Sequence, residues 1–179
     1  MKGEQQQINT AGNKLGSEAK TTQTNNMQET LKKISTKGIS AKQAMGLTDE
    51  MVEGIYGQAY RLFNNGKYND ADQLFRLLLM INPTEGKYTM GLAACLHMQK
   101  DYKAAADVYA IVGIIDPQNP VPFYHAADCF MQLHDAMSAI IALEMAITRA
   151  GEKPEYRILK DRAALTLASL KKNAAETAK

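Results

Sequence analysis

Alanines recur in this chain at a spacing of 34 residues, at positions 71, 105 and 139, and the side chains around them recur in the same order of size. A second column of alanines keeps the same spacing, and so do two columns of larger apolar residues. These columns are Ala59, Ala93 and Ala127; Leu62, Leu96 and Phe130; and Phe75, Tyr109 and Leu143. Agreement over three periods predicts a chain built from three copies of one structural unit.

The unit has the features of a pair of antiparallel helices. Alanine on one helix facing a large side chain on the next lets two helices approach closely. Asn82-Pro83 and Asp116-Pro117 are typical of helix ends, because a residue that precedes proline avoids the helical conformation. A 34-residue period of this kind is the signature of the tetratricopeptide repeat. We therefore predict an all-α fold, with six helices between about residues 50 and 150 forming three tetratricopeptide repeats in a right-handed superhelix.

The regions that flank the repeats differ in composition. Residues 1–26 are rich in Gln, Asn and Thr with few large apolar side chains, which predicts a disordered polar tail. Residues 27–47 carry helically spaced apolar residues, which predicts a separate N-terminal helical element. Residues 48–172 are predicted to hold the repeats and a C-terminal capping helix, in which Pro154 occupies the first turn. Residues 173–179 are expected to fray.

Composition excludes several classes of protein. Two cysteines and three histidines without paired spacing argue against a zinc site or a disulfide framework, so no metal is expected. The net charge of +2 and the lack of a dense basic stripe argue against nucleic-acid binding. No run approaches the roughly 20 apolar residues that cross a bilayer, and the N-terminus lacks the apolar core of a secretion signal. The expected location is the cytoplasm, without insertion into a membrane.

The repeat register also predicts a binding surface. In stacked repeats of this kind, the inner wall is lined by the residues three before, one after and four after the small alanine of each first helix. That rule selects aromatic, thioether and few charged side chains, a surface suited to an extended apolar segment. With one tyrosine added at the first turn, the predicted peptide-binding groove is Tyr56, Tyr60, Phe63, Tyr68, Met90, Ala94, His97, Tyr124, Asp128 and Met131.

Two other functions fit these positions poorly. A clamp for an acidic C-terminal tail needs Lys, Asn and Arg on the same faces, where this chain has Tyr and Met. An enzyme needs a cluster of reactive side chains, and we find neither a catalytic set nor a glycine-rich phosphate loop. His97, His125 and His134 are expected to lie on separate faces. The sequence therefore predicts a binding protein that is not an enzyme.

Three segments resemble a known family. They are Ile55–Tyr60 (IYGQAY), Asn65–Ala71 (NGKYNDA) and Phe123–Cys129 (FYHAADC), and they look like the class II chaperones of bacterial type III secretion. The resemblance covers roughly residues 31–170. It implies a cytoplasmic bacterial chaperone of a virulence system that needs no cofactor and holds one or two hydrophobic translocator proteins soluble before export. In that family a short extended segment of the client lies in the concave groove, which here implies roles for Tyr56, Tyr60 and Tyr68.

The resemblance also implies a homodimer through the N-terminal element, at residues 27–47. An alternative remains open, namely a general tetratricopeptide scaffold that joins components of a larger assembly. A scaffold binds folded partners and leaves their solubility unchanged, whereas a chaperone keeps an otherwise insoluble client in solution.

Overall fold

The computed structural model describes residues 41–177 and divides the chain into two units, residues 1–49 and 50–179. In the first unit, α2 (Ala41–Ala44) is a single helical turn followed by Gly46, whose φ of 68° lies in the left-handed region that glycine tolerates. Lys42 Nζ lies 2.5 Å from Asp49 Oδ1. The predicted tail at residues 1–26 and residues 27–40 of the N-terminal element lie outside the described residues.

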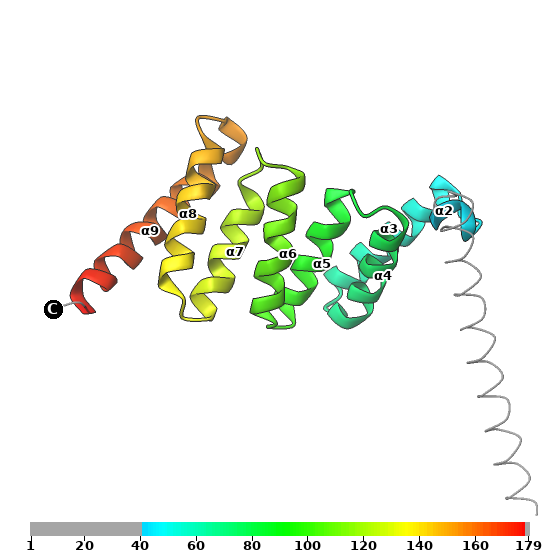
Figure 1. Cartoon of the computed structure of the whole chain (residues 1–179), viewed down its shortest axis with the longest axis horizontal. Coiled ribbons are helices and arrows are strands. Elements are labelled where there is room, and N and C mark those ends of the chain that lie inside the picture. Colours follow the sequence, from blue (N-terminus) through cyan, green and yellow to red (C-terminus); the bar gives the residue numbers. More distant parts are fainter. Residues whose placement is uncertain (1–40, 178–179) are drawn as a thin grey trace, which may run out of the picture. The chain divides into compact units, whose positions relative to one another are not determined.

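The second unit is a row of antiparallel helices that pack in chain order (Figure 1). The first helices of the three repeats, called here the A helices, are α3 (Asp49–Asn64), α5 (Gly86–Met98) and α7 (Val121–Gln132). The second helices, called the B helices, are α4 (Tyr68–Ile81), α6 (Tyr102–Ile115) and α8 (Ala136–Ala150). No strand occurs between residues 41 and 177. The six predicted helices and the all-α class are confirmed.

Each A helix ends in the same left-handed turn. Gly66, Lys100 and His134 stand 34 residues apart and have φ of 75°, 66° and 58°. In the first repeat, the N–H of the next residue, Lys67, donates to the carbonyl of Leu62 at 2.9 Å, the reach of a Schellman motif. The N–H of Gly66 donates to the carbonyl of Phe63, and the same pair of hydrogen bonds closes the other two A helices. Only the first repeat has glycine at a position where the backbone favours it.

Prolines end the first two B helices, as the sequence predicts. Asn82 and Asp116, which precede Pro83 and Pro117, are the C-cap residues of α4 and α6 and have φ of −143° and −127°. Both leave the helical region, because the following proline ring would clash with a helical neighbour.

The core consists of small residues facing large ones. All six alanines of the two repeating columns are fully buried, as are Cys95 and Cys129. Burial raises the pKa of both thiols to about 12. Both cysteines are therefore protonated packing residues rather than reactive thiolates.

The C-terminal helix closes the row. A 3₁₀ turn at Pro154–Tyr156 precedes α9 (Arg157–Thr177), so Pro154 stands in that turn and not in the first turn of the α-helix. Ala163 of α9 is buried in a cluster with Ala127, Ala142 and Leu143. The predicted capping helix is confirmed. It runs on to Thr177, through a region rich in alanine, which favours helix.

Candidate peptide-binding groove

One hollow lies along the A helices and has a volume of about 660 Å³. We call it the A-helix groove. Residues from α3, α5 and α7 form its walls, and one residue of α6 reaches into it. The lining consists of Phe63, Met90, Ala94, His97, Met98, Tyr109, Tyr124, His125, Asp128 and Met131. Most of these side chains are aromatic, thioether or aliphatic.

Seven of the ten residues predicted for a groove line this hollow, namely Phe63, Met90, Ala94, His97, Tyr124, Asp128 and Met131. They come together because positions three before, one after and four after one alanine share one face of a helix. The face is thus a contiguous surface from Phe63 at the end of α3 across α5 and α7. Its binding role remains a prediction.

The other three predicted residues lie outside the groove lining. Tyr56 packs its ring against Phe75 and Tyr88, with centroids 6.2 and 5.7 Å away, and Lys87 Nζ lies 4.5 Å from its centroid. Tyr60 is 54% exposed. Tyr68 meets the ring of Phe63 edge to face at 5.4 Å. Tyr68 therefore supports a groove residue, whereas Tyr56 is largely engaged with its own neighbours.

The groove contains one carboxylate, which is held by a histidine. His97 Nε2 lies 2.9 Å from Asp128 Oδ2, and the side chain of Asp128 is 41% exposed. His97 and His125 have ring centroids only 6.3 Å apart. The prediction that the three histidines lie on separate faces is wrong for these two, because neighbouring A helices turn both rings toward the same residue of α6.

That residue is Tyr109. The ring of His125 stacks on it with centroids 5.5 Å apart and planes inclined by 20°, and His97 meets it edge to face at 6.2 Å. Burial raises the pKa of the Tyr109 hydroxyl. Burial lowers the pKa of His125, and the neighbouring His97 lowers it further. At neutral pH, Tyr109 and His125 are therefore both uncharged.

Three groove residues escaped the sequence prediction, namely Met98, Tyr109 and His125. Tyr109 belongs to a column otherwise filled by Phe75 and Leu143, and its hydroxyl is the feature of the sequence that sets it apart from those two purely apolar side chains. His125 stands in the column of Gly57 and Gly91. A large ring where two other repeats have glycine marks a place where the groove differs between repeats.

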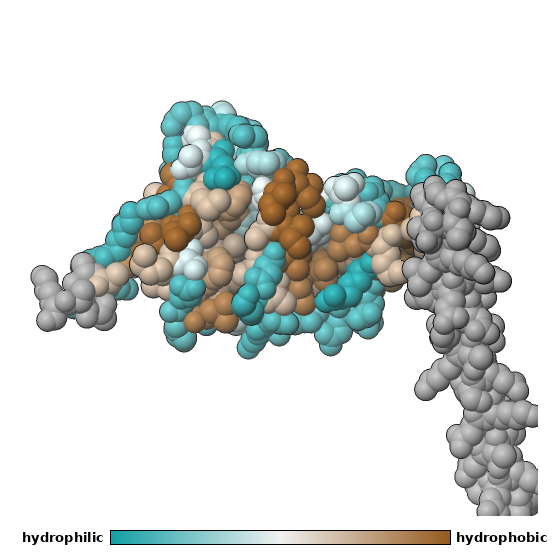
Figure 2. All heavy atoms as spheres, viewed as in Figure 1, coloured by the Kyte–Doolittle hydropathy of each residue, from teal (hydrophilic) through white to brown (hydrophobic). Residues whose placement is uncertain are grey.

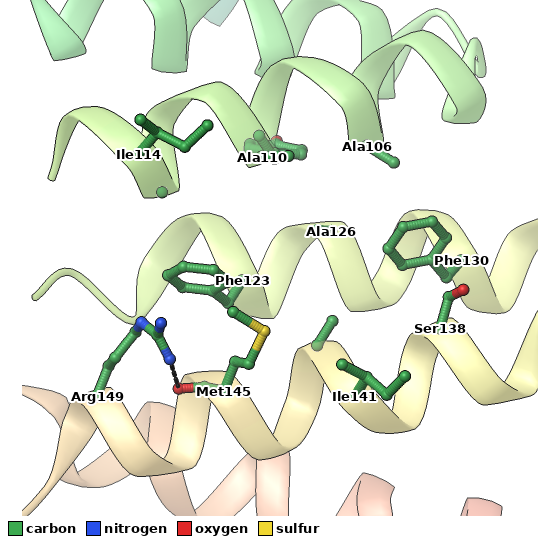
Figure 3. Close-up of a pocket in the computed structure, with 13 residues that line it drawn as sticks. Ala106, Ala110, Ile114, Phe123, Ala126, Phe130, Ser138, Ile141, Met145 and Arg149 are labelled. Atoms are coloured by element: carbon green, nitrogen blue, oxygen red, sulfur yellow. Dashed lines mark hydrogen bonds between the residues drawn. The ribbon is translucent and has the colours of Figure 1, made fainter. Parts of the chain in front are cut away.

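A second hollow of about 460 Å³ lies between the B helices α6 and α8, over α7 (Figure 3). We call it the B-helix trough. Ala106, Ala110 and Ile114 come from α6, whereas Phe123 and Phe130 come from α7 (Figure 3). Tyr109 lines both hollows.

Arg149 stands at one end of the trough. Its guanidinium lies over the ring of Phe123, 4.3 Å from the centroid, and donates to the carbonyls of Pro117 and Met145. Figure 2 shows hydrophobic surface near this region, over the end of α6, where Ile114 is 77% exposed. The repeat rule did not predict this trough, because it considers only the A helices.

The groove offers surfaces for contact with a partner. Among the described residues, no group of three or more His, Cys, Asp and Glu side chains is placed to hold a metal ion. Within residues 41–177, no helix has both the length and the apolar character needed to cross a bilayer. The groove offers large aromatic and methionine surfaces, two uncharged rings and one carboxylate.

Comparison with known proteins agrees with this description. The model of the tetratricopeptide repeat family matches residues 52–83 and 87–119. Chaperone protein SicA of Salmonella typhimurium is 29% identical over 134 residues, which cover 75% of this chain and 79% of SicA. The crystal structure of PcrH of Pseudomonas aeruginosa in complex with the chaperone-binding region of PopD has a TM-score of 0.69 at 28% identity, covering 72% of this chain and 97% of PcrH.

The chaperone SycD of Yersinia enterocolitica is a third relative of this kind. In complex with a peptide of the translocator YopD it has a TM-score of 0.69 at 27% identity, covering 71% of this chain and 97% of SycD. The chain belongs to the class II chaperones of type III secretion. The resemblance of the sequence of this class II chaperone to that family is confirmed. The named relatives are chaperones rather than enzymes.

Proposed function

We propose that this class II chaperone binds hydrophobic translocator proteins of a type III secretion system and keeps them soluble and competent for export. An extended segment of the client lies in the A-helix groove. The segment is bound reversibly, so the export machinery can take it by competition. Binding protects apolar side chains of the client from aggregation, and no nucleotide or other cofactor takes part.

The observation that carries the proposal is the A-helix groove itself. Aromatic and methionine side chains line most of it, including Phe63, Met90, Tyr124 and Met131. Tyrosine and methionine give large and adaptable contact area, which suits alternate apolar side chains of an extended segment. Relatives of the same fold have been solved with segments of the translocators PopD and YopD bound.

The remaining features of the proposal follow from the family. The chaperone acts in the bacterial cytoplasm, where the client must be held before export, and it performs no catalysis. It forms a homodimer through residues 27–47. Of these, only residues 41–47 lie in the described part of the chain.

The experiment is co-expression with the translocator proteins encoded in the same genome, followed by affinity capture and sizing of the soluble complex. We expect a translocator that is insoluble alone to be recovered in solution with the chaperone. Recovery of only those partners that are soluble by themselves would instead support the general tetratricopeptide scaffold.

A matched pair of variants locates the binding surface. Met98 lines the groove and is 49% exposed, whereas Met80 of α4 is 53% exposed and does not line it. Met98→Glu should therefore reduce recovery of the client at unchanged melting temperature, and Met80→Glu should leave recovery unchanged. Equal recovery with both variants would place the client elsewhere. Tyr60→Ala extends the test to the first repeat.

A further inference from the structure

The A-helix groove has a polar centre that an apolar client does not by itself explain. Asp128 stands on α7 among Tyr124, Met131 and Met90, and its side chain remains 41% exposed. No Lys or Arg side chain among the described residues lies within ion-pair distance of this carboxylate, and its ion-pair partner is His97. Burial of a carboxylate under a bound segment is costly unless a donor satisfies it.

The carboxylate is held in place by its partner. His97 Nε2 lies 2.9 Å from Asp128 Oδ2. The imidazole meets Tyr102, Tyr109 and His125, with centroids 5.8 to 6.3 Å away. These three rings fix the imidazole, and the imidazole fixes the carboxylate.

The lining of the groove supplies little positive charge to the carboxylate of Asp128. None of the ten lining residues is Lys or Arg. His125 is uncharged at neutral pH because burial lowers its pKa, and Tyr109 stays protonated because burial raises its pKa. A carboxylate accepts about four hydrogen bonds, and its ion-pair partner His97 approaches only one of the two oxygens of Asp128. The centre of the groove therefore presents acceptors and needs donors.

The position of Asp128 determines which part of a client can supply hydrogen-bond donors to it. Asp128 shares the wall of the groove with the apolar residues Met90, Tyr124 and Met131. Along an extended segment, alternate side chains face the same wall. A client whose apolar side chains contact this wall therefore also points a side chain toward Asp128.

We propose that Asp128, held by His97, is a specificity-determining residue that selects clients with a Lys, Arg, Asn or Gln side chain opposite it and rejects those with Asp or Glu there. This inference rests on the proposed function of the groove. A donor side chain satisfies the carboxylate, whereas an acidic one brings two like charges together as the segment excludes water. Such repulsion provides specificity that apolar contacts cannot.

The test uses the wild-type chaperone and the segment of its own translocator that it captures. Labelled peptides of this segment carry Lys, Gln or Glu in turn at each position, and their dissociation constants are measured by fluorescence anisotropy. At one position we expect Lys to bind at least about tenfold more tightly than Glu, with Gln between them. The ratio should fall toward one in Asp128→Asn, which keeps the size of the side chain.

Two controls make the outcome decisive. Asp161 of α9 is exposed and does not line the groove, so Asp161→Asn should keep the wild-type ratio. Melting temperatures of both variants should match the wild type. A wild-type chaperone that binds the segment without any charge-sensitive position, or a ratio that persists in Asp128→Asn, overturns this inference alone. Failure of the wild type to bind any segment of its translocators overturns the proposed function, and this inference with it.

Discussion

The ring of Phe75 lies against the backbone of Gly91, so closely that a Cβ atom on Gly91 would stand 2.2 Å from Phe75 Cε1. Phe75 is 2% exposed and belongs to the B helix of the first repeat, while Gly91 belongs to the next A helix. One period later, Tyr109 and His125 occupy the same two columns and stack ring on ring. Between the first and second repeats, this contact is thus made by one ring against the backbone of a glycine. Between the second and third repeats, it is made by two stacked rings.

The first prediction concerns Gly91. Gly91→Ala should lower the free energy of unfolding by about 1–3 kcal/mol, because the buried ring of Phe75 must move to admit the methyl group. Gly57 occupies the same column in α3, and a Cβ there would meet nothing within 4 Å. Gly57→Ala should therefore stabilise the protein by about 0.5–1 kcal/mol. Urea unfolding of both variants measures the difference, and equal changes would contradict it.

The second prediction concerns the turns at the ends of the A helices. His134 has φ of 58° at a place where the first repeat has Gly66. A residue with a Cβ pays about 1 kcal/mol for this conformation, which glycine adopts freely. His134→Gly should therefore raise the free energy of unfolding by up to about 1 kcal/mol.

His134→Ala is the matched control, because alanine shortens the exposed side chain but keeps the Cβ atom. It should bring no gain in urea unfolding. If alanine and glycine stabilise equally, relief of the left-handed turn is not the cause.

The third prediction is a dependence of stability on pH. Burial lowers the pKa of His125 in the folded protein, with His97 adding to the effect and Asp128 opposing it. The unfolded chain then binds more protons than the folded one below the ordinary histidine pKa of about 6.5. The free energy of unfolding should therefore fall as the pH is lowered from about 7 to 5.

His125→Phe keeps a ring for Tyr109 to stack on and removes the titrating group. Its free energy of unfolding should fall less steeply over the same pH range than that of the wild type. Denaturant unfolding at several pH values measures both slopes, and parallel curves would show that His125 does not contribute.

The face of each A helix could be predicted from the sequence, because helical periodicity alone decides which residues stand beside Ala93 and Ala127. Tyr109 could not be placed in the groove in this way. Tyr109 is buried, and its place in the lining depends on how α6 packs between the two neighbouring A helices. Tyr56 shows the converse, since it satisfies the rule for the face but is taken up by Phe75 and Tyr88. Helical periodicity predicts the direction in which a side chain points, and the neighbouring side chains determine whether it stays accessible.

The last prediction concerns the starts of the B helices. Asp101 and Asp135 cap α6 and α8, and their carboxylates accept from the N–H groups of Ala104 at 3.2 Å and Ser138 at 3.0 Å. In the first repeat the same place is Lys67, which makes no side-chain cap. Lys67→Asp should raise the free energy of unfolding by about 0.5–1 kcal/mol, because it supplies the missing acceptor for the first turn of α4.

A change at Asp135 tests the same cap in the opposite direction. Asp135→Ala should lower the melting temperature, because the N–H of Ser138 loses its partner. Lys67→Ala separates the new cap from simple loss of the lysine, and it should bring no gain. Thermal unfolding of the three variants decides the matter: a gain with Ala as large as that with Asp would mean that the charge of Lys67, and not the absent cap, limits α4.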